Sequence, residues 1–272
     1  MLFALSILFG GLVGFALGLT GGGGSLLAVP LLVYGLAVPP REAFGISLAA
    51  VGATALIGLI PRVAAHQVEI GTGTLFAVAG MVGAPVGTWL ASMIPGDVLL
   101  ALFAVLILIV AWRMWGASQP DRAFSRHTNG AADADGPTCR RTADGRLTLT
   151  SGCAVLLLGV GLATGVLSGL FGVGGGFVIV PALVLFSGMP IRRAAATSLL
   201  VIALVSVSGV TSHFVAGSGI SLPITGLFVL GGVVGMLLGG DVATRLSTVA
   251  LQKVFASGIV TVAVFMATKA IL

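Results

Sequence analysis

Residues 18–30 read GLTGGGGSLLAVP, and residues 169–181 read GLFGVGGGFVIVP. The second stretch repeats the first at a distance of 151 residues, and each places a run of glycines between apolar segments. The same distance pairs residues well outside these runs: Gly14 with Gly165, Pro39 with Pro190, Ala43 with Ala194, and Gly58 with Gly209. A repeat of this kind indicates that one half of the molecule was duplicated.

The composition indicates that lipid surrounds much of the chain. Apolar residues make up 57% of the 272 residues, and charged residues make up only 8%. The mean hydropathy is +1.18, whereas a soluble domain usually carries about 25% charged residues. Because backbone polar groups must be paired inside lipid, only helices or a closed barrel can span a membrane. The long continuous apolar runs exclude a barrel, so we expect an all-α polytopic membrane protein.

The apolar segments form two groups of five, one on each side of a polar stretch. They cover residues 2–19, 25–37, 42–60, 72–94 and 97–115, and then 151–170, 176–188, 194–212, 222–240 and 247–268. Segments of about 18–23 residues can cross a bilayer at 1.5 Å per residue. The pieces at 25–37 and 176–188 are too short, and each follows a glycine run, which indicates a re-entrant helix. We predict about eight hydrophobic spans and up to ten helical pieces.

The chain is expected to have three parts: a first membrane repeat at residues 1–115, a linker at 116–150 and a second membrane repeat at 151–272. The linker is polar, mixed in charge and nearly without apolar residues, so it cannot bury a core. The two cysteines, Cys139 and Cys153, have no C-x-x-C or metal-ligand spacing, and we interpret them as unrelated thiols.

The glycine run also decides how the repeats are oriented. If it makes a hairpin, each repeat crosses the membrane an odd number of times and the repeats are inverted. If it only kinks a crossing helix, the repeats are parallel. With the arginine-rich linker in the cytoplasm, inverted repeats also place Arg62, Arg192, Arg193 and Arg245 inside, whereas parallel repeats move the last three outside. The positive-inside rule therefore favours inverted repeats in the cytoplasmic (inner) membrane.

The glycine runs are the leading candidates for a binding site. Glycine adopts positive φ angles without a Cβ clash and lets a ligand approach closely, and a helix start offers unpaired N–H groups to an anion. Paired breaks in two repeats are typical of the central site of a transporter. Ser25 is also interpreted as a helix N-cap. The candidate substrate-binding residues are Gly21, Gly22, Gly23, Gly24, Ser25, Gly172, Gly174, Gly175 and Gly176.

Other glycines have a different explanation. Two sets are spaced four residues apart, a pattern that favours close packing of membrane helices. They are Gly10, Gly14 and Gly18 in the first repeat, and Gly161, Gly165 and Gly169 in the second. Gly80 and Gly231, paired by the repeat, are assigned to packing as well. A dinucleotide fingerprint is excluded, because it should follow a strand and here the glycines follow an apolar helix.

The duplicated G-x-G-G-G, the downstream Pro30 and Pro181, the GISL at 45–48 and the ATSL at 196–199 resemble the TauE/SafE sulfite exporter family of membrane permeases. The resemblance covers nearly the whole chain except the linker. It implies a permease or exporter for small sulfur-containing anions such as sulfite, sulfoacetate or thiosulfate, with both glycine motifs near the centre of the path. Ser25 replaces the last glycine of the first motif, so the two halves are expected to differ as ligands.

Three hydroxyls and two arginines complete the candidate site. Ser47, Thr197 and Ser198 lie in the first turns of the helices that follow the short pieces, where they either donate to an anion or bond other helices. Arg41 and Arg192 begin the same two helices. They either attract anions to the two mouths of the path or anchor the helices at the membrane interface.

Enzymatic and nucleic-acid functions are not indicated. There is no H-E-x-x-H and no P-loop, we expect no cofactor and no metal site, and most arginines lie beside membrane segments, as topology requires. No carboxylate lies in the middle of a predicted span, so coupling uses other groups or transport is uncoupled. The expected partners are a small sulfur-containing anion and membrane lipid. Two alternatives stay open: a passive anion channel, and a membrane assembly or sulfur-trafficking partner that moves nothing itself.

Overall fold

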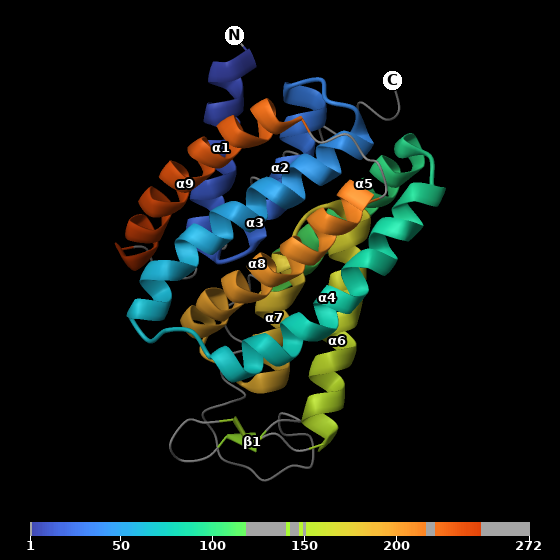
Figure 1. The fold of residues 1–272 in the computed structure, drawn as a ribbon. Coiled ribbons are helices and arrows are strands. Elements are labelled where there is room, and N and C mark those ends of the chain that lie inside the picture. Colours follow the sequence, from blue (N-terminus) through green and yellow to red (C-terminus); the bar gives the residue numbers. More distant parts are fainter. Residues whose placement is uncertain (1, 118–139, 142–146, 149–150, 216–220, 246–272) are drawn as a thin grey trace.

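The computed structural model describes residues 2–117, 140–141, 147–148, 151–215 and 221–245 (Figure 1). The long helices of the first half are α1 (Leu2–Thr20), α3 (Pro40–Ala64), α4 (Ile70–Met93) and α5 (Gly96–Ala117). Between α1 and α3 lie a 3-10 turn η1 (Gly23–Leu27), an α-turn α2 (Ala28–Pro30) and a π-turn η2 (Leu31–Gly35). The second half contains α6 (Ser151–Phe171), α7 (Gly176–Ser187), α8 (Ile191–Val215) and α9 (Leu222–Arg245).

The predicted all-α polytopic fold is confirmed. Six of the described helices are long and apolar enough to cross a membrane: α1, α3, α4, α6, α8 and α9. The seventh expected span, at 97–115, is helical in α5, and the eighth, at 247–268, lies outside the described residues. The two short apolar pieces occur where they were expected, as residues 23–35 and as α7.

The two central helices start in the same way because their sequences repeat. Pro39 precedes α3 and Pro190 precedes α8, and in each case the proline carbonyl accepts the N–H of the residue four positions on, Ala43 or Ala194, at 2.9 Å. Proline suits the position just before a helix, because an N–H there would have no intrahelical partner. The two prolines therefore end the short pieces and begin the helices that line the candidate site.

Two short strands lie within the linker. Strands β1 (Arg140–Arg141) and β2 (Leu147–Thr148) pair antiparallel, with Arg140 opposite Thr148. Cys153 is buried and disulfide-bonded, so the prediction of two unrelated thiols is wrong. The other cysteine, Cys139, lies outside the described residues. Sequence spacing alone does not reveal this pairing of strands beside the two cysteines.

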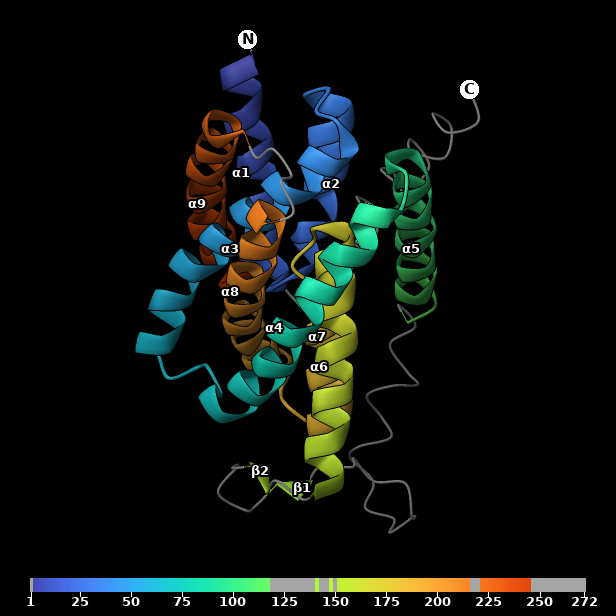
Figure 2. The same ribbon diagram turned by 45° about the vertical axis from the view of Figure 1, so that its right-hand side comes forward.

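The two repeats are inverted, as the charge pattern predicted. α1 runs from the end marked N toward the linker end of the molecule, whereas α6 starts beside the linker strands and runs in the opposite direction (Figure 2). Across the repeats, α1 packs along α9 and α4 packs along α6. These two pairs are exchanged by the repeat, because α6 is the copy of α1 and α9 is the copy of α4.

Glycines spaced four residues apart form both of these helix crossings. In α1, Gly10, Gly14 and Gly18 approach the carbonyl groups of Phe228, Gly232 and Met236 in α9. In α6, Gly161, Gly165 and Gly169 approach those of Phe76, Gly80 and Ala84 in α4. A Cβ atom added to Gly14 would lie 1.9 Å from the carbonyl oxygen of Gly232, and one added to Gly165 would lie 2.1 Å from that of Gly80. The assignment of these stripes to close packing is confirmed.

One pairing drawn from the repeat is wrong by a residue. Gly80 was paired with Gly231, but the crossings match Gly80 with Gly232, because Gly165 packs on Gly80 and its counterpart Gly14 packs on Gly232. The distance between the repeats is therefore 152 residues in α4 and α9, and 151 in the preceding helices. The second repeat gains one residue in its connection between α8 and α9.

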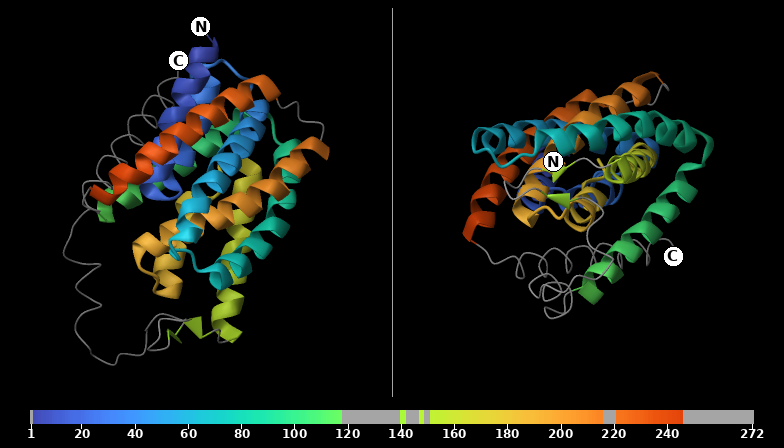
Figure 3. Two further views of the ribbon diagram at one scale, coloured as in Figure 1. Left: turned by 60° about the vertical axis from the view of Figure 1, so that its left-hand side comes forward. Right: turned by 90° about the horizontal axis from the view of Figure 1, so that it is seen from below.

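Helices α3 and α8 form the centre and pack against each other, and they are the most buried of the six long helices. α9 lies along α1, and α5 stands to one side of the bundle (Figure 3). Phe103 of α5 contacts the ring of Phe44 at 6.2 Å and that of Phe171 at 5.6 Å between centroids. These contacts join α5 to the first turn of α3 and to the last turn of α6.

Candidate functional site

The two glycine breaks touch each other. The first break comprises residues 21–25 and the second break comprises residues 172–176. A Cβ atom added to Gly22 would lie 2.7 Å from the carbonyl oxygen of Gly176, and one added to Gly176 would lie 2.6 Å from the Cα of Gly22. Both residues are buried. Two backbones thus meet at a point where neither residue can carry a side chain.

Each break docks against the first turns of the central helix of the other repeat. Gly21 (φ 77°) lies against Ala195 of α8, where an added Cβ would be 2.6 Å from the Cα of Ala195. Gly172 (φ 62°) lies against Phe44 of α3 in the same way, at 2.6 Å from its Cα. Ala195 and Phe44 are equivalent in the repeat. The positive φ angles and the close approach require glycine at both positions.

Hydroxyl groups satisfy the backbone of the first break. Thr20 accepts the N–H of Gly23 at 3.0 Å, Ser25 donates its hydroxyl to the carbonyl of Gly22 at 2.7 Å, and Ser198 of α8 donates to the carbonyl of Gly21. Ser25 lies inside the 3-10 turn, whose N-cap is Gly22 and has no side-chain cap bond. The prediction that Ser25 is an N-cap is therefore wrong, because the turn starts before Ser25.

The second break opens a regular helix. Its Gly174 and Gly175 have φ angles of 71° and 68°, and Gly175 is the N-cap of the twelve-residue helix α7. Val178 and Ile179 donate their N–H groups to the carbonyl of Gly175. Within the described part of the chain, the N–H groups of Gly174 and Gly175 have no acceptor. These groups lie at the positive end of the helix dipole, which favours an anion.

The three predicted hydroxyls have different surroundings. Thr197 accepts the N–H of Glu69 at 3.0 Å, and Ser198 donates to the carbonyls of Gly21 and Ala195. Ser47 is fully buried, but its hydroxyl has no hydrogen-bond partner among the described residues. The interhelical alternative therefore describes Thr197 and Ser198, and Ser47 alone keeps a hydroxyl that is open to a ligand.

Two further serines near the second break were missed. Ser168 of α6 and Ser206 of α8 are 1% and 2% exposed, and their hydroxyls have no partner among the described residues. A comparison of the repeats at each position would have revealed them, since Ser168 corresponds to Leu17 and Ser206 to Ala55. Motif spacing did not, because neither residue lies in a glycine run.

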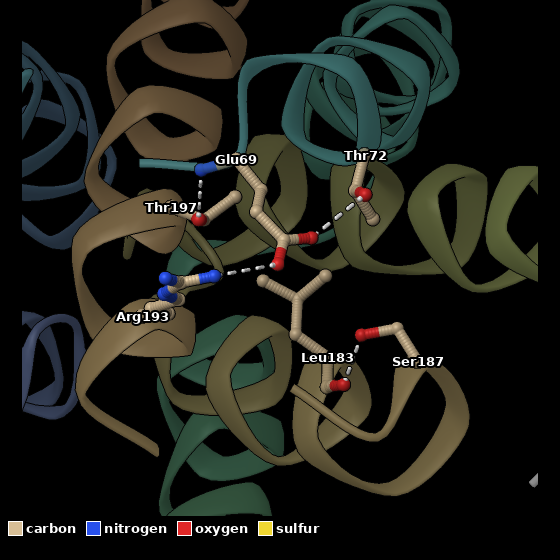
Figure 4. Close-up of polar contacts among 6 residues, drawn as sticks. All are labelled: Glu69, Thr72, Leu183, Ser187, Arg193 and Thr197. Carbon is tan, nitrogen blue, oxygen red and sulfur yellow. Dashed lines mark hydrogen bonds and ion pairs between the residues drawn. The ribbon is translucent and has the colours of Figure 1, made fainter. Parts of the chain in front are cut away.

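A polar cluster joins α8 to the connection between α3 and α4, near the linker end of the molecule (Figure 4). Glu69 accepts a hydrogen bond from Thr72 at 3.2 Å and lies 3.9 Å from the guanidinium of Arg193, while its N–H donates to Thr197. The side chain of Arg193 is 50% exposed, so the ion pair itself contributes only about 0–1 kcal/mol. The sequence did not single out this cluster, because it joins residues more than a hundred positions apart.

The two repeat-paired arginines differ in what they contact. Arg41 donates to the carbonyls of Ser92 at 3.2 Å and Ile94 at 2.8 Å, at the C-terminal end of α4. A cation is favourable there because it complements the helix dipole. Arg192 is exposed at the start of α8 and has no partner among the described residues. These contacts hold Arg41 against the end of α4, and the attraction of anions stays a prediction for both arginines.

The far ends of α3 and α8 carry a second repeat-paired position. Arg62 donates to the carbonyl of Gly18 at 3.0 Å, near the last turn of α1. The equivalent residue in α8 is His213, which is 4% exposed and lies beside the backbone of Gly169, the repeat counterpart of Gly18. The described residues contain no group of three or more His, Cys, Asp or Glu that could hold a metal ion.

The profile described as "Sulfite exporter TauE/SafE" matches residues 6–266. The chain belongs to the TauE/SafE sulfite exporter family. The family resemblance first seen in the glycine motifs is therefore confirmed over nearly the whole chain, and the protein is a multi-pass membrane transporter.

Relatives from distant organisms carry matching descriptions. A "Probable membrane transporter protein" of Xylella fastidiosa is 36% identical over 94% of this chain and 91% of its own length. The "Probable membrane transporter protein YunE" of Bacillus subtilis is 26% identical over 91% of this chain and 89% of its own length. No solved structure matches the chain significantly. These descriptions support a transporter and do not name its substrate.

Proposed function

We propose that this TauE/SafE protein carries small sulfur-containing anions, such as sulfite, sulfoacetate or thiosulfate, across the cytoplasmic membrane. The contact between Gly22 and Gly176 carries the proposal, because it joins the broken segments of two inverted repeats between the central helices. Discontinuous helices that meet at the repeat interface are typical of binding sites in secondary transporters. The start of α7 suits an anion in particular. The description of the family as a sulfite exporter supports the sulfur chemistry.

Transport requires a change of conformation. Gly22, Gly175 and Gly176 are buried, so an anion from either side reaches them only after part of the structure moves. The inverted repeats provide two related units that can rock against each other and expose the centre first to one side and then to the other. With the linker in the cytoplasm, the cluster of Glu69, Thr197 and Arg193 lies on the cytoplasmic side, and we propose that its contacts break when the site opens to that side.

A binding and flux panel tests this function. Purified protein is reconstituted in liposomes, and uptake and binding are measured for sulfite, thiosulfate, sulfoacetate, sulfate and chloride. We expect uptake of at least one sulfur anion above protein-free liposomes. Gly22→Val, which places a side chain at the contact between the breaks, is expected to abolish it. Absence of binding and flux for every sulfur anion would overturn the proposal, and binding without flux would favour a trafficking partner.

A further inference from the structure

The residues around the second break are more polar than their counterparts around the first. Thr164, Ser168 and Ser206 of the second repeat correspond to Val13, Leu17 and Ala55 of the first. All six positions were duplicated together, so the two sites started from the same geometry. The hydroxyls therefore belong to one site only, although the glycine runs are shared by both.

Three hydroxyls, those of Ser47, Ser168 and Ser206, have no hydrogen-bond partner among the described residues and are assigned to the second break. A Cβ atom added to Gly174 would lie 3.8 Å from the hydroxyl oxygen of Ser206, and one added to Gly175 would lie 3.7 Å from the Cβ of Ser168. Ser47 follows Phe44 by three residues and precedes Val51 by four, so the three share one face of α3.

That face of α3 is turned toward the second break. Phe44 contacts Gly172, and Val51 contacts Gly174. Ser47 therefore lies between the two contacts that α3 makes with the break. Three helices, α3, α6 and α8, thus each bring a buried hydroxyl without a partner to the N-terminus of α7.

The first break offers no comparable set. Its neighbouring hydroxyls, those of Thr20, Ser25 and Ser198, are bonded to the backbone of the break itself. It is also packed more tightly at Gly24, where an added Cβ atom would lie 2.3 Å from the backbone nitrogen of Leu17. At Gly174 and Gly175 the nearest atoms would be 3.1 and 3.2 Å away. The first break therefore serves as a structural partner.

We propose that the protein has one oxyanion site, at the second break, formed by the hydroxyls of Ser47, Ser168 and Ser206 together with the N–H groups of Gly174 and Gly175. The inference rests on the proposed function. It narrows the anion site from two symmetric glycine breaks to the second break alone. A buried hydroxyl without a partner costs stability, and an oxyanion removes that cost by accepting its hydrogen bond. Each serine donates one hydrogen bond, so three serines can serve the three oxygens of a sulfite or sulfonate group.

The experiment measures sulfite binding by titration calorimetry and the melting temperature of the detergent-purified protein without ligand. The variants are Ser47→Ala, Ser168→Ala and Ser206→Ala. Ser6→Ala is the matched control, because Ser6 is a buried hydroxyl that donates to the carbonyl of Leu2. We expect one sulfite per chain for the wild type and about 10-fold weaker binding for each of the three variants. Ser206→Cys, close in size but a weak donor, is expected to lie in between.

The melting temperature separates binding from structure. Removing a hydroxyl that has no partner should leave the ligand-free melting temperature unchanged or raise it. Removing the hydroxyl of Ser6, which bonds a carbonyl of its own helix, should change the melting temperature little and keep sulfite binding. Wild-type binding with unchanged affinity in all three variants, or two anions per chain, would overturn the single site while the proposed function survives. A wild type that binds none of sulfite, thiosulfate and sulfoacetate would overturn both.

Discussion

The carbonyl oxygen of Gly176 lies 2.7 Å from the point where any side chain at Gly22 would begin. Residues 154 positions apart thus share one contact at the centre of the protein, and each belongs to a different repeat. Backbones that approach this closely leave room for no side chain. The two glycine runs, which are separate motifs in the sequence, therefore meet at one place in the fold.

The helix crossings allow a test with a matched pair in one helix. Gly165→Ala places a Cβ atom 2.1 Å from the carbonyl oxygen of Gly80, whereas Gly159→Ala, also in α6, meets no atom of the described residues within 4 Å. We expect Gly165→Ala to destabilise the protein by about 1–3 kcal/mol through overpacking. Gly159→Ala should be neutral or stabilising by up to about 1 kcal/mol, because alanine favours a helix. Thermal unfolding of the purified variants measures both, and equal effects would contradict the crossing.

Substitution of the two paired arginines is expected to affect different properties: stability for Arg41 and anion uptake for Arg192. Arg41→Ala leaves two carbonyls at the end of α4 without their cation and should cost about 1–2 kcal/mol of stability. Arg192→Ala should change stability by less than about 0.5 kcal/mol, but it should slow anion uptake at low ionic strength if Arg192 attracts anions. Unfolding curves and initial rates at two salt concentrations separate these effects. A stability loss as large for Arg192→Ala as for Arg41→Ala would refute the distinction.

The inverted orientation predicts which connections face the same side. Gln67 lies in the connection between α3 and α4, and Asp97 lies at the start of α5, at the other end of the bundle; both are exposed. In a cysteine-free background, Gln67→Cys should react with a membrane-impermeant thiol reagent only from the linker side. Asp97→Cys should react only from the opposite side. Labelling of both from one side would rule out this topology.

The chemistry of the second break predicts a preference for singly charged anions, so that hydrogen sulfite should bind more tightly than the dianions thiosulfate and sulfoacetate. The atoms nearest to a Cβ added at Gly174 or Gly175 belong to Val51, Thr164, Ser168, Ile179, Ile202 and Ser206, none of which is ionisable. Burying a second negative charge among neutral donors is costly. At one fixed pH, methanesulfonate should therefore compete with sulfite at least about 10-fold better than the dianion sulfate does. Competition binding measures this ratio, and stronger competition by sulfate would contradict it.

Much of the fold could be predicted from the sequence because it depends on periodic and repeated features. The apolar segments, the short pieces after the glycines and the packing stripes, such as that of Gly161, Gly165 and Gly169, follow from local spacing. The inverted orientation follows from where the arginines lie. What spacing cannot give is the partner across the bundle, so the match of Gly80 with Gly232 required the contacts themselves.

The candidate site was predicted only in part, for a physical reason. Residue type does not show whether a hydroxyl is already bonded: Ser47 and Ser198 are repeat equivalents, yet within the described ranges only Ser198 has a partner. Tight packing also makes the effects of glycine substitutions hard to assign to substrate binding. Comparing Gly24→Ala with Gly175→Ala does not separate the roles of the breaks, because a Cβ at Gly24 would collide with the backbone of α1. Removing hydroxyls is therefore the cleaner experiment.

Counterflow tests the central claim most directly, because a carrier that alternates around one buried site exchanges anions across the membrane. Proteoliposomes are loaded with unlabelled sulfite and diluted into a trace of radiolabelled sulfite. We predict transient accumulation of label above equilibrium, which is weakened in Ser206→Ala and retained in Ser6→Ala. Uptake that only equilibrates, with no overshoot, would indicate a passive channel, and uptake no greater than in protein-free liposomes would contradict sulfite transport altogether.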